Sequence, residues 1–100
     1  MIYITQFIYL FEGQEELFDE FEKIAIPAIQ KYNGRLLLRV RPDENSFVEH
    51  HMERPYEIHF VEFDTEEDFE NFKQDKERLK YLHLKEHSVK ASIMIRGAKI

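Results

Sequence analysis

The chain has 100 residues, no cysteine, and 20 acidic against 14 basic side chains, which gives a formal net charge of −6. This length supports one hydrophobic core, so we expect a single domain over residues 1–100. The acidic balance without a basic block disfavours nucleic acid and membrane as partners, and the lack of cysteine excludes disulfides, thiol nucleophiles and thiolate metal sites.

The N-terminal segment from Ile2 to Phe11 is rich in β-branched and aromatic residues and predicts the first strand. It carries no basic region or small-residue cleavage site, and it is much shorter than a membrane span. We therefore expect a cytoplasmic protein.

A first helix is predicted between Gly13, which can cap its start, and Asn33 with Gly34, which can end it. Pro27 lies inside this segment and is expected to kink or break the helix, because it cannot donate to the carbonyl of Lys23. The apolar stripe of the helix consists of Leu17, Phe18, Phe21, Ile24, Ala25, Ala28, Ile29 and Tyr32.

The second strand is predicted from Arg35 to Arg41, followed by a polar loop from Pro42 to Pro55. Within that loop Phe47 and Val48 are candidates for a short extra strand.

The third strand is predicted from Tyr56 to Phe63 and the fourth from Val89 to Arg96. Between them Thr65 and Asp68 have the spacing of a capping box, which starts a second helix. Its inward residues are Phe69, Phe72, Leu79 and Leu82, and the polar run Gln74, Asp75 and Lys76 is expected to interrupt it.

The second half of the chain repeats the first. Phe63, Phe69 and Phe72 in "VEFDTEEDFENF" follow the pattern of Phe11, Phe18 and Phe21 in "YLFEGQEELFDEF". Two β-α-β halves predict an α+β, ferredoxin-like βαββαβ sandwich, an antiparallel four-stranded sheet in the order 4-1-3-2 with both helices on one face.

The other face of this sheet would be bare and apolar. The first strand carries Ile2, Ile4, Ile8 and Leu10 on one side and Tyr3, Phe7, Tyr9 and Phe11 on the other, so either choice exposes large apolar side chains. Such a surface favours aggregation unless it is covered. A homodimer that packs two sheets face to face is the simplest cover.

The stretches "IPAIQKYNGRLLLRV" and "YEIHFVEFDTEEDFENFKQDKERLKYLHLKEHSV" resemble the dimeric α+β barrel superfamily, especially its small domains of unknown function related to the antibiotic-biosynthesis monooxygenases. The resemblance covers nearly the whole chain. It implies a homodimer with a cleft that binds small hydrophobic molecules, but it implies no single reaction, because members include enzymes and non-enzymes. The absence of tryptophan argues against the haem-degrading members.

A candidate site arises from strand alternation. If Leu36, Leu38 and Val40 share one face, Leu37, Arg39 and Arg41 share the other, and Glu57, His59 and Val61 lie opposite Ile58 and Phe60. Arg39, Arg41, Glu57 and His59 would then meet on the open face, in the cleft between the sheet and the dimer partner. The predicted catalytic residues are His59, Arg39 and Arg41, and the predicted ligand-binding residues are Glu57, Tyr9 and Phe7.

In the catalytic interpretation, His59 accepts or donates a proton near neutral pH and an arginine holds a carboxylate or enolate oxygen. In the alternative, an arginine pairs with Glu57 across the strands and His59 fills an ordinary structural role. We favour the second, because one histidine among charged neighbours is a weak catalytic signal. A one-residue error in strand phase would move all these side chains to the opposite face.

Other polar pairs indicate little chemistry. The loop cluster Glu49, His50 and His51 and the pair His83 and His87 offer weak metal-ligand spacing, so we expect no metal site. Asp75 and Arg78 are expected to form a surface ion pair or to stabilise a turn. Tyr3, Tyr9 and Tyr56 suit packing and interfaces.

Three functional classes follow. The first is a homodimer that binds a small hydrophobic or aromatic molecule without catalysis or cofactor. The second is a cofactor-independent oxygenase or isomerase acting on an activated aromatic or enolisable substrate. Haem or metal binding through a histidine is the third and weakest.

Overall fold

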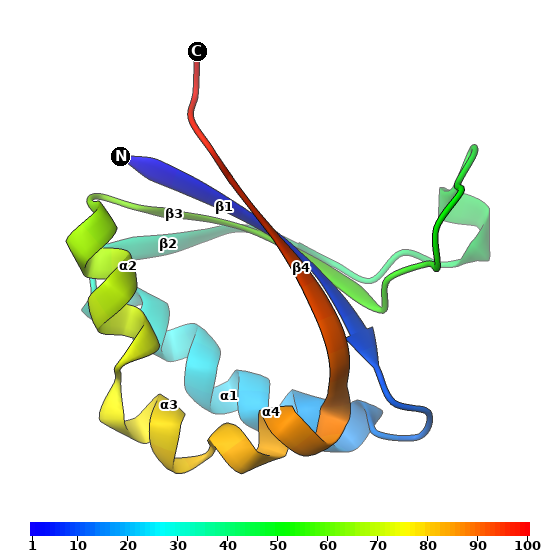
Figure 1. The fold of residues 1–100 in the computed structure, drawn as a ribbon, viewed down its shortest axis with the longest axis horizontal. Helices are drawn as coiled ribbons and strands as arrows, with labels where there is room; N and C mark the ends of the chain where they lie inside the picture. The colour runs from blue at the N-terminus through cyan, green and yellow to red at the C-terminus, as the bar shows by residue number, and fades with distance from the viewer.

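The computed structural model describes residues 1–100, and it consists of one sheet covered on one side by helices (Figure 1). The strands are β1 (Ile2–Leu10), β2 (Gly34–Val40), β3 (Glu57–Phe63) and β4 (Val89–Gly97). The helices are α1 (Glu15–Lys31), α2 (Glu66–Lys73), α3 (Lys76–Lys80) and α4 (Leu82–Ser88), with a 3-10 turn, η1, at Glu44–Ser46.

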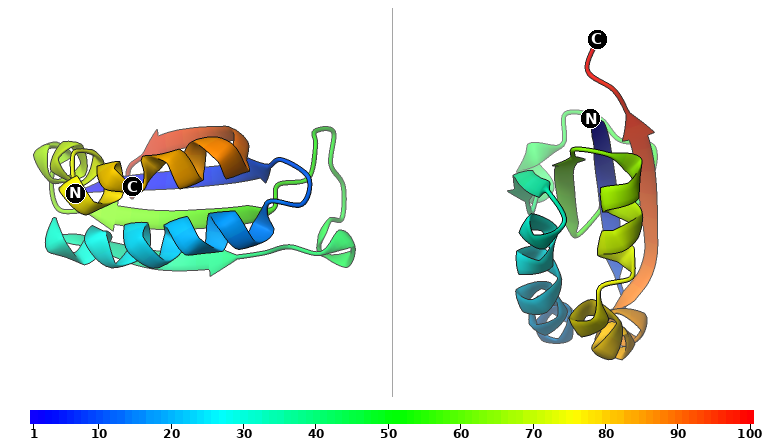
Figure 2. Two further views of the ribbon diagram at one scale, coloured as in Figure 1. Left: turned by 90° about the horizontal axis from the view of Figure 1, so that it is seen from below. Right: turned by 90° about the vertical axis from the view of Figure 1, so that its left-hand side faces the viewer.

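The sheet is antiparallel throughout and has the order β2-β3-β1-β4, so the predicted ferredoxin-like topology is confirmed. The second helical segment consists of α2, α3 and α4, and Figure 2 shows it running alongside α1 on the same side of the sheet. The opposite side, which we call the open face, carries no helix.

Helix α1 packs its apolar stripe on the sheet, with Phe18, Phe21 and Ala28 buried. Burying a phenylalanine of this kind stabilises a fold by about 1.5 to 3 kcal/mol. The helix runs through Pro27 without a break, contrary to one of the two expected outcomes. Pro27 lies on the exposed side of the helix, where water can reach the carbonyl of Lys23 that it leaves unbonded.

The ends of α1 differ in their agreement with prediction. Gln14, not Gly13, is the N-cap residue, and Gly13 instead takes a positive φ of 80° in the preceding turn. At the other end Asn33 adopts the left-handed conformation with φ 57°, as a helix-ending residue does. Gly34 then passes so close to Phe63 that a Cβ atom would lie 2.6 Å from its ring, so only glycine fits there.

The predicted interruption of the second helical segment is confirmed. Thr65 caps α2 by accepting from the Asp68 amide, and Asp75 caps α3 by accepting from the Arg78 amide. Asp75 is buried rather than on the surface, and it also accepts a hydrogen bond of 2.8 Å from the Tyr32 hydroxyl. Leu79, expected to point inward, is exposed.

The loop between β2 and β3 contains no extra strand. Phe47 follows η1 in extended conformation but neither Phe47 nor Val48 pairs with another strand, and Val48 is fully exposed. The Asp43 and Ser46 side chains instead close η1 as a reciprocal cap. The prediction of a short strand here was wrong, because Phe47 and Val48 lie beside no partner strand.

No helix in the structure has both the length and the apolar character needed to cross a membrane.

Candidate functional site

A β-bulge at Leu37 decides which side chains of β2 face the helices. Leu36 pairs with Val61, but Leu38 pairs with Phe60, so Leu37 is an extra residue in β2. The alternation therefore reverses after Leu36. Leu38 and Val40 lie on the open face, and Arg39 and Arg41 lie on the helix side.

The predicted assignment of these residues to faces was therefore wrong. Leu36, Leu38 and Val40 do not share a face, and the arginines do not lie on the open face. A bulge cannot be read from a run such as "LLLRV", because its position depends on how the partner strand is packed.

Strand β3 presents Glu57, His59, Val61 and Phe63 to the helices, and all four are buried. The sequence placed Glu57 and His59 opposite Ile58 and Phe60, which is correct, but on the open face, which is wrong. Because both strands are reversed together, Arg39, Arg41, Glu57 and His59 still meet, now on the helix side. We call these four residues, with Glu22 of α1, the polar cluster.

Phe7 and Tyr9 do not join this cluster. They alternate with Ile8, which is buried against the helices, so they lie on the open side of β1. The predicted ligand-binding set is thus divided between two faces of the sheet. Tyr9 is itself buried, and its hydroxyl has no hydrogen-bond partner.

Glu57 is the centre of the polar cluster and is fully buried. Its two oxygens accept from the Nε atoms of Arg41 at 2.6 Å and Arg39 at 3.1 Å, and one of them also meets Nε2 of His59. Burial alone would raise the pKa of this carboxyl, but the hydrogen bonds from His59, Arg41 and Arg39 outweigh burial and lower the pKa to about 2. Glu57 is therefore ionised at neutral pH, and its hydrogen bonds fix the imidazole.

Glu22 of α1 is the acid that the sequence analysis missed. It is buried, its Oε1 lies 3.6 Å from Nε2 of His59, and it forms no hydrogen bond. Burial is the main cause that raises its pKa to about 7, and the charge of Glu57 raises the pKa further, while His59 opposes both. This carboxyl can hold or release a proton near neutral pH.

A signal for Glu22 exists in the sequence. It stands four residues after Phe18 and three before Ala25, so it lies on the apolar stripe of the helix rather than on the polar face. An acid in that position must be buried, and a buried acid without a partner carries a shifted pKa.

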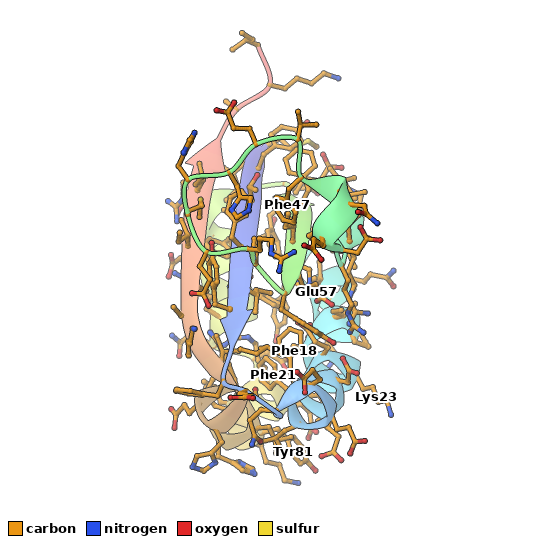
Figure 3. The ribbon with its side chains drawn as sticks, turned by 90° about the vertical axis from the view of Figure 1, so that its right-hand side faces the viewer. Phe18, Phe21, Lys23, Phe47, Glu57 and Tyr81 are labelled. Atoms are coloured by element: carbon orange, nitrogen blue, oxygen red, sulfur yellow. The ribbon has the colours of Figure 1, made fainter.

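A cavity of about 160 Å³ lies between the sheet and the helices, and Glu22 and His59 are part of its wall. Of its 19 lining residues, 13 are hydrophobic. Figure 3 shows Phe18 and Phe21 of α1 on the side of the helix towards the sheet and Glu57, whereas Lys23 points outward. An apolar cavity with a few convergent polar groups is the usual form of a small-molecule site.

The same wall contains three half-buried cations. Lys73 of α2 pairs with Glu70, whereas Arg78 of α3 and Lys85 of α4 form no ion pair. Burial lowers the pKa of both groups, and the charge of Arg78 lowers the pKa of Lys85 further. Sequence analysis had assigned Arg78 only a surface or turn-stabilising role. Its backbone does stabilise the turn, but its guanidinium forms no ion pair with Asp75.

Three donor atoms of Glu22, Glu57 and His59 lie within 4.8 Å of one another and could supply ligands to a metal ion. Two arginines already bind the Glu57 carboxylate, and their charges oppose a divalent cation there. The other histidines, whose spacing was considered for metal binding, are elsewhere. His51 pairs with Glu49 in the exposed loop, His50 contacts the carbonyl of Met52, and His83 and His87 are exposed.

The open face is more apolar than this cavity, and its ion pair joins Arg35 and Glu62. Tyr3 stacks on Phe60 across two strands, with ring centroids 5.7 Å apart. Tyr9 on this face is buried, and by strand pairing and alternation the large apolar side chains that are at least partly exposed on it are Tyr3, Phe7, Leu38, Val40, Ile58, Phe60, Ile93 and Ile95. Several of them are substantially exposed, including Leu38 and Ile95.

Comparisons with known proteins support the fold. No protein-family model matches the sequence, and no curated protein matches it significantly. Solved structures do match. A protein of unknown function from Rhodopseudomonas palustris has a TM-score of 0.82 at 12% identity, with 99% of this chain and 82% of that chain covered.

Two other solved structures are similar, and one of them is named for the group that the sequence resemblance indicated. A candidate antibiotic biosynthesis monooxygenase from Nitrosomonas europaea matches with a TM-score of 0.75 at 10% identity, covering 100% of this chain and 99% of that one. An uncharacterised NIPSNAP domain protein from Burkholderia xenovorans matches with a TM-score of 0.73 at 10% identity, covering 100% of this chain and 95% of that one. These matches, at 10 to 12% identity, confirm the predicted ferredoxin-like α+β fold.

Proposed function

We propose that this α+β barrel protein binds a small, mostly apolar molecule in the cavity between its sheet and its helices. The observation that carries the proposal is the cavity itself, which has a predominantly hydrophobic wall and a buried carboxyl, Glu22, whose charged neighbour His59 lies 3.6 Å away, too far for a hydrogen bond. A buried carboxyl that accepts no hydrogen bond costs stability, so its retention favours a role in binding. The binding site is thus moved from the cleft beside the dimer partner to the interior of the protomer.

We also propose that the protein is a homodimer whose protomers cover each other's open face. The eight apolar side chains on that face form a surface that water disfavours, and its paired strands offer no hydrogen-bonding groups of their own. A second copy of the chain presents the same apolar surface, so two copies can cover each other symmetrically. The cytoplasmic location expected from the sequence stays a prediction.

Native mass spectrometry of gently purified protein tests both statements. We expect a dimer that carries additional mass from a retained small molecule. The variant Ala25→Leu fills part of the cavity and should lose the additional mass while remaining dimeric, with an unchanged circular dichroism spectrum. A monomer would contradict the dimer, and a retained molecule unaffected by Ala25→Leu would contradict the cavity.

A second candidate function is cofactor-independent proton transfer on an enolisable or activated aromatic substrate, as in an isomerase or oxygenase. The observation that favours it is the pKa of Glu22, which burial raises to about 7, the range in which a carboxyl serves as general acid or base. Glu22 would exchange the proton, and His59 beside it would share that proton. Arg39 and Arg41, bound to Glu57, would act as positioning residues rather than as the oxyanion partners first predicted.

Deuterium exchange separates catalysis from binding. The molecule recovered from the purified protein would be incubated with the protein in D₂O and its mass measured. Catalysis predicts incorporation of deuterium that Glu22→Gln abolishes and Glu16→Gln, an exposed acid on the same helix, preserves. Incorporation that is equal with and without protein would leave binding as the sole function.

A further inference from the structure

The more buried cations of the chain do not all have the ion-pair partners that several of its exposed cations have. Arg78 is the one arginine that is not classed as exposed, while Lys73 and Lys85 are the only such lysines. Lys73 pairs with Glu70 at 2.9 Å. Arg78 and Lys85 form no ion pair at all, although exposed Arg35, Arg41 and Arg96 each have a carboxylate partner.

This distribution is the reverse of what stability alone would favour. A charge loses solvation when it is buried, so a buried cation needs a counter-charge more than an exposed cation does. Here two cations are close enough to lower the pKa of Lys85 by repulsion, and both line the cavity. The protein therefore places two cations without an ion-pair partner beside an apolar space.

The contacts of Arg78 leave most of its donors free. Its Nη1 donates to the carbonyl of Lys73 at 3.2 Å, and its guanidinium lies over the rings of Phe72 and Phe21 at 5.3 and 5.9 Å. These contacts fix the side chain without supplying a negative charge. A guanidinium held in this way can still donate two parallel hydrogen bonds to a carboxylate.

Glu22 does not serve as the missing partner. It lines the same cavity, but it lies beyond ion-pair distance of Arg78 and Lys85, and its own pKa is raised rather than lowered. Burial lowers the pKa of both cations more than the charge of Glu22, and for Arg78 also that of Asp75, raises it. A carboxyl that was neutralised by two cations would have a lowered pKa. The three groups thus face a shared space that none of them fills.

We propose that the ligand of this cavity is an amphipathic monoanion, whose acid group binds Arg78 and Lys85 while its apolar body packs among the phenylalanines. This inference rests on the proposed binding function and names its ligand class. The cavity of about 160 Å³ is similar in size to engineered cavities that hold a single aromatic ring. The expected ligand is therefore a one-ring aromatic acid or an aliphatic acid of similar volume.

The test compares two probes of nearly equal shape, phenylacetate and phenylacetamide, by calorimetric titration into the wild-type protein at pH 7. Phenylacetate should bind about tenfold more tightly, because only the anion forms charge-assisted hydrogen bonds with the two cations. Arg78→Gln and Lys85→Gln should each remove most of that advantage and leave phenylacetamide binding within about twofold.

Two controls keep the result interpretable. Lys76→Gln changes an exposed lysine of α3 that does not line the cavity and should affect neither probe. Lys85→Gln removes a side chain that makes no hydrogen bond, so it remains informative if Arg78→Gln does not fold. Phenylacetate binding that survives both cavity substitutions would overturn the inference.

The outcomes also separate this inference from the proposed function. Equal affinity for the acid and the amide would overturn the anionic ligand class but leave the cavity as a binding site. If neither probe binds, the proposed binding function is contradicted and the anionic ligand with it.

Discussion

The two faces of one sheet differ in kind. The helix side carries buried charges, a carboxyl with a shifted pKa and a cavity, whereas the open face carries apolar side chains in regular rows. Buried charge is costly and persists where binding or chemistry requires it, while a flat apolar surface requires only a matching surface. The difference indicates that the helix side is adapted for a ligand and the open face for association.

The largest expected effect is a loss of stability, and it is tested by substituting two glutamates of β3 that lie on opposite faces of the sheet. Glu57→Gln should lower the free energy of unfolding by about 3 kcal/mol, because it leaves Arg39, Arg41 and His59 without their shared carboxylate. The partial exposure of the arginines keeps the loss at the lower end of the range for buried ion pairs. Urea denaturation at one fixed protein concentration measures it.

Glu62→Gln is the matched control on the open side of the same strand. Glu62 pairs with Arg35 at 2.6 Å, but this arginine is 43% exposed, so the loss should be at most about 1 kcal/mol. Similar losses for the two substitutions would contradict the claim that the two faces differ.

A charged substitution tests whether the open face is the dimer interface. Ile95→Lys should weaken dimerisation by about 30-fold, because the interface must bury an unpaired ammonium group, while the fold of the protomer is retained. Sedimentation velocity measures the association. Ile95 is 52% exposed and Leu79, on α3, is 42% exposed, so Leu79→Lys is the matched control and should leave the dimer intact.

The cavity side should show a pH dependence that the open face lacks. Since the folded-state pKa of Glu22 is raised to about 7 from an ordinary 4.5, the folded protein retains a proton that the unfolded chain releases. Stability should thus fall by about 2 kcal/mol between pH 5 and pH 8. Below pH 4.5 the lowered pKa of Glu57 has the opposite effect, and stability falls as that carboxylate is protonated.

Thermal unfolding at several pH values measures this profile, with Glu22→Gln as the informative variant. Without a titrating carboxyl at this position, the decline between pH 5 and pH 8 should disappear. Glu16→Gln, on the exposed side of the same helix, should retain it. A decline that persists in Glu22→Gln would assign the pH dependence to another group.

Local patterns predicted most of the fold. The repeated phenylalanines, the strand segments and the break after α2 were all readable, because each depends on residues close in the sequence. The meeting of Arg39, Arg41, Glu57 and His59 was also readable from strand pairing. Their face was not, because one extra residue at Leu37 reverses the alternation of β2.

The residues of the cavity wall were harder to predict from the sequence. Arg78 and Lys85 lie on short helices α3 and α4, whose rotation relative to the sheet depends on the turns at Asp75 and Tyr81. Glu22 had a detectable signal in its helical position, but its distance of 3.6 Å from His59, too long for a hydrogen bond, emerges only when the other elements are packed around it.

The central claim is that the ligand binds on the helix side of the sheet and not on the open face. An amide-resolved NMR titration with phenylacetamide tests it most directly. Each strand has residues whose side chains face the helices and residues whose side chains face the open side, and the titration follows each residue separately. We expect chemical-shift changes centred on Ala25, Ile29, Val61 and Met94, which line the cavity. Changes centred on Leu38, Ile58 and Ile95 of the open face would contradict the account.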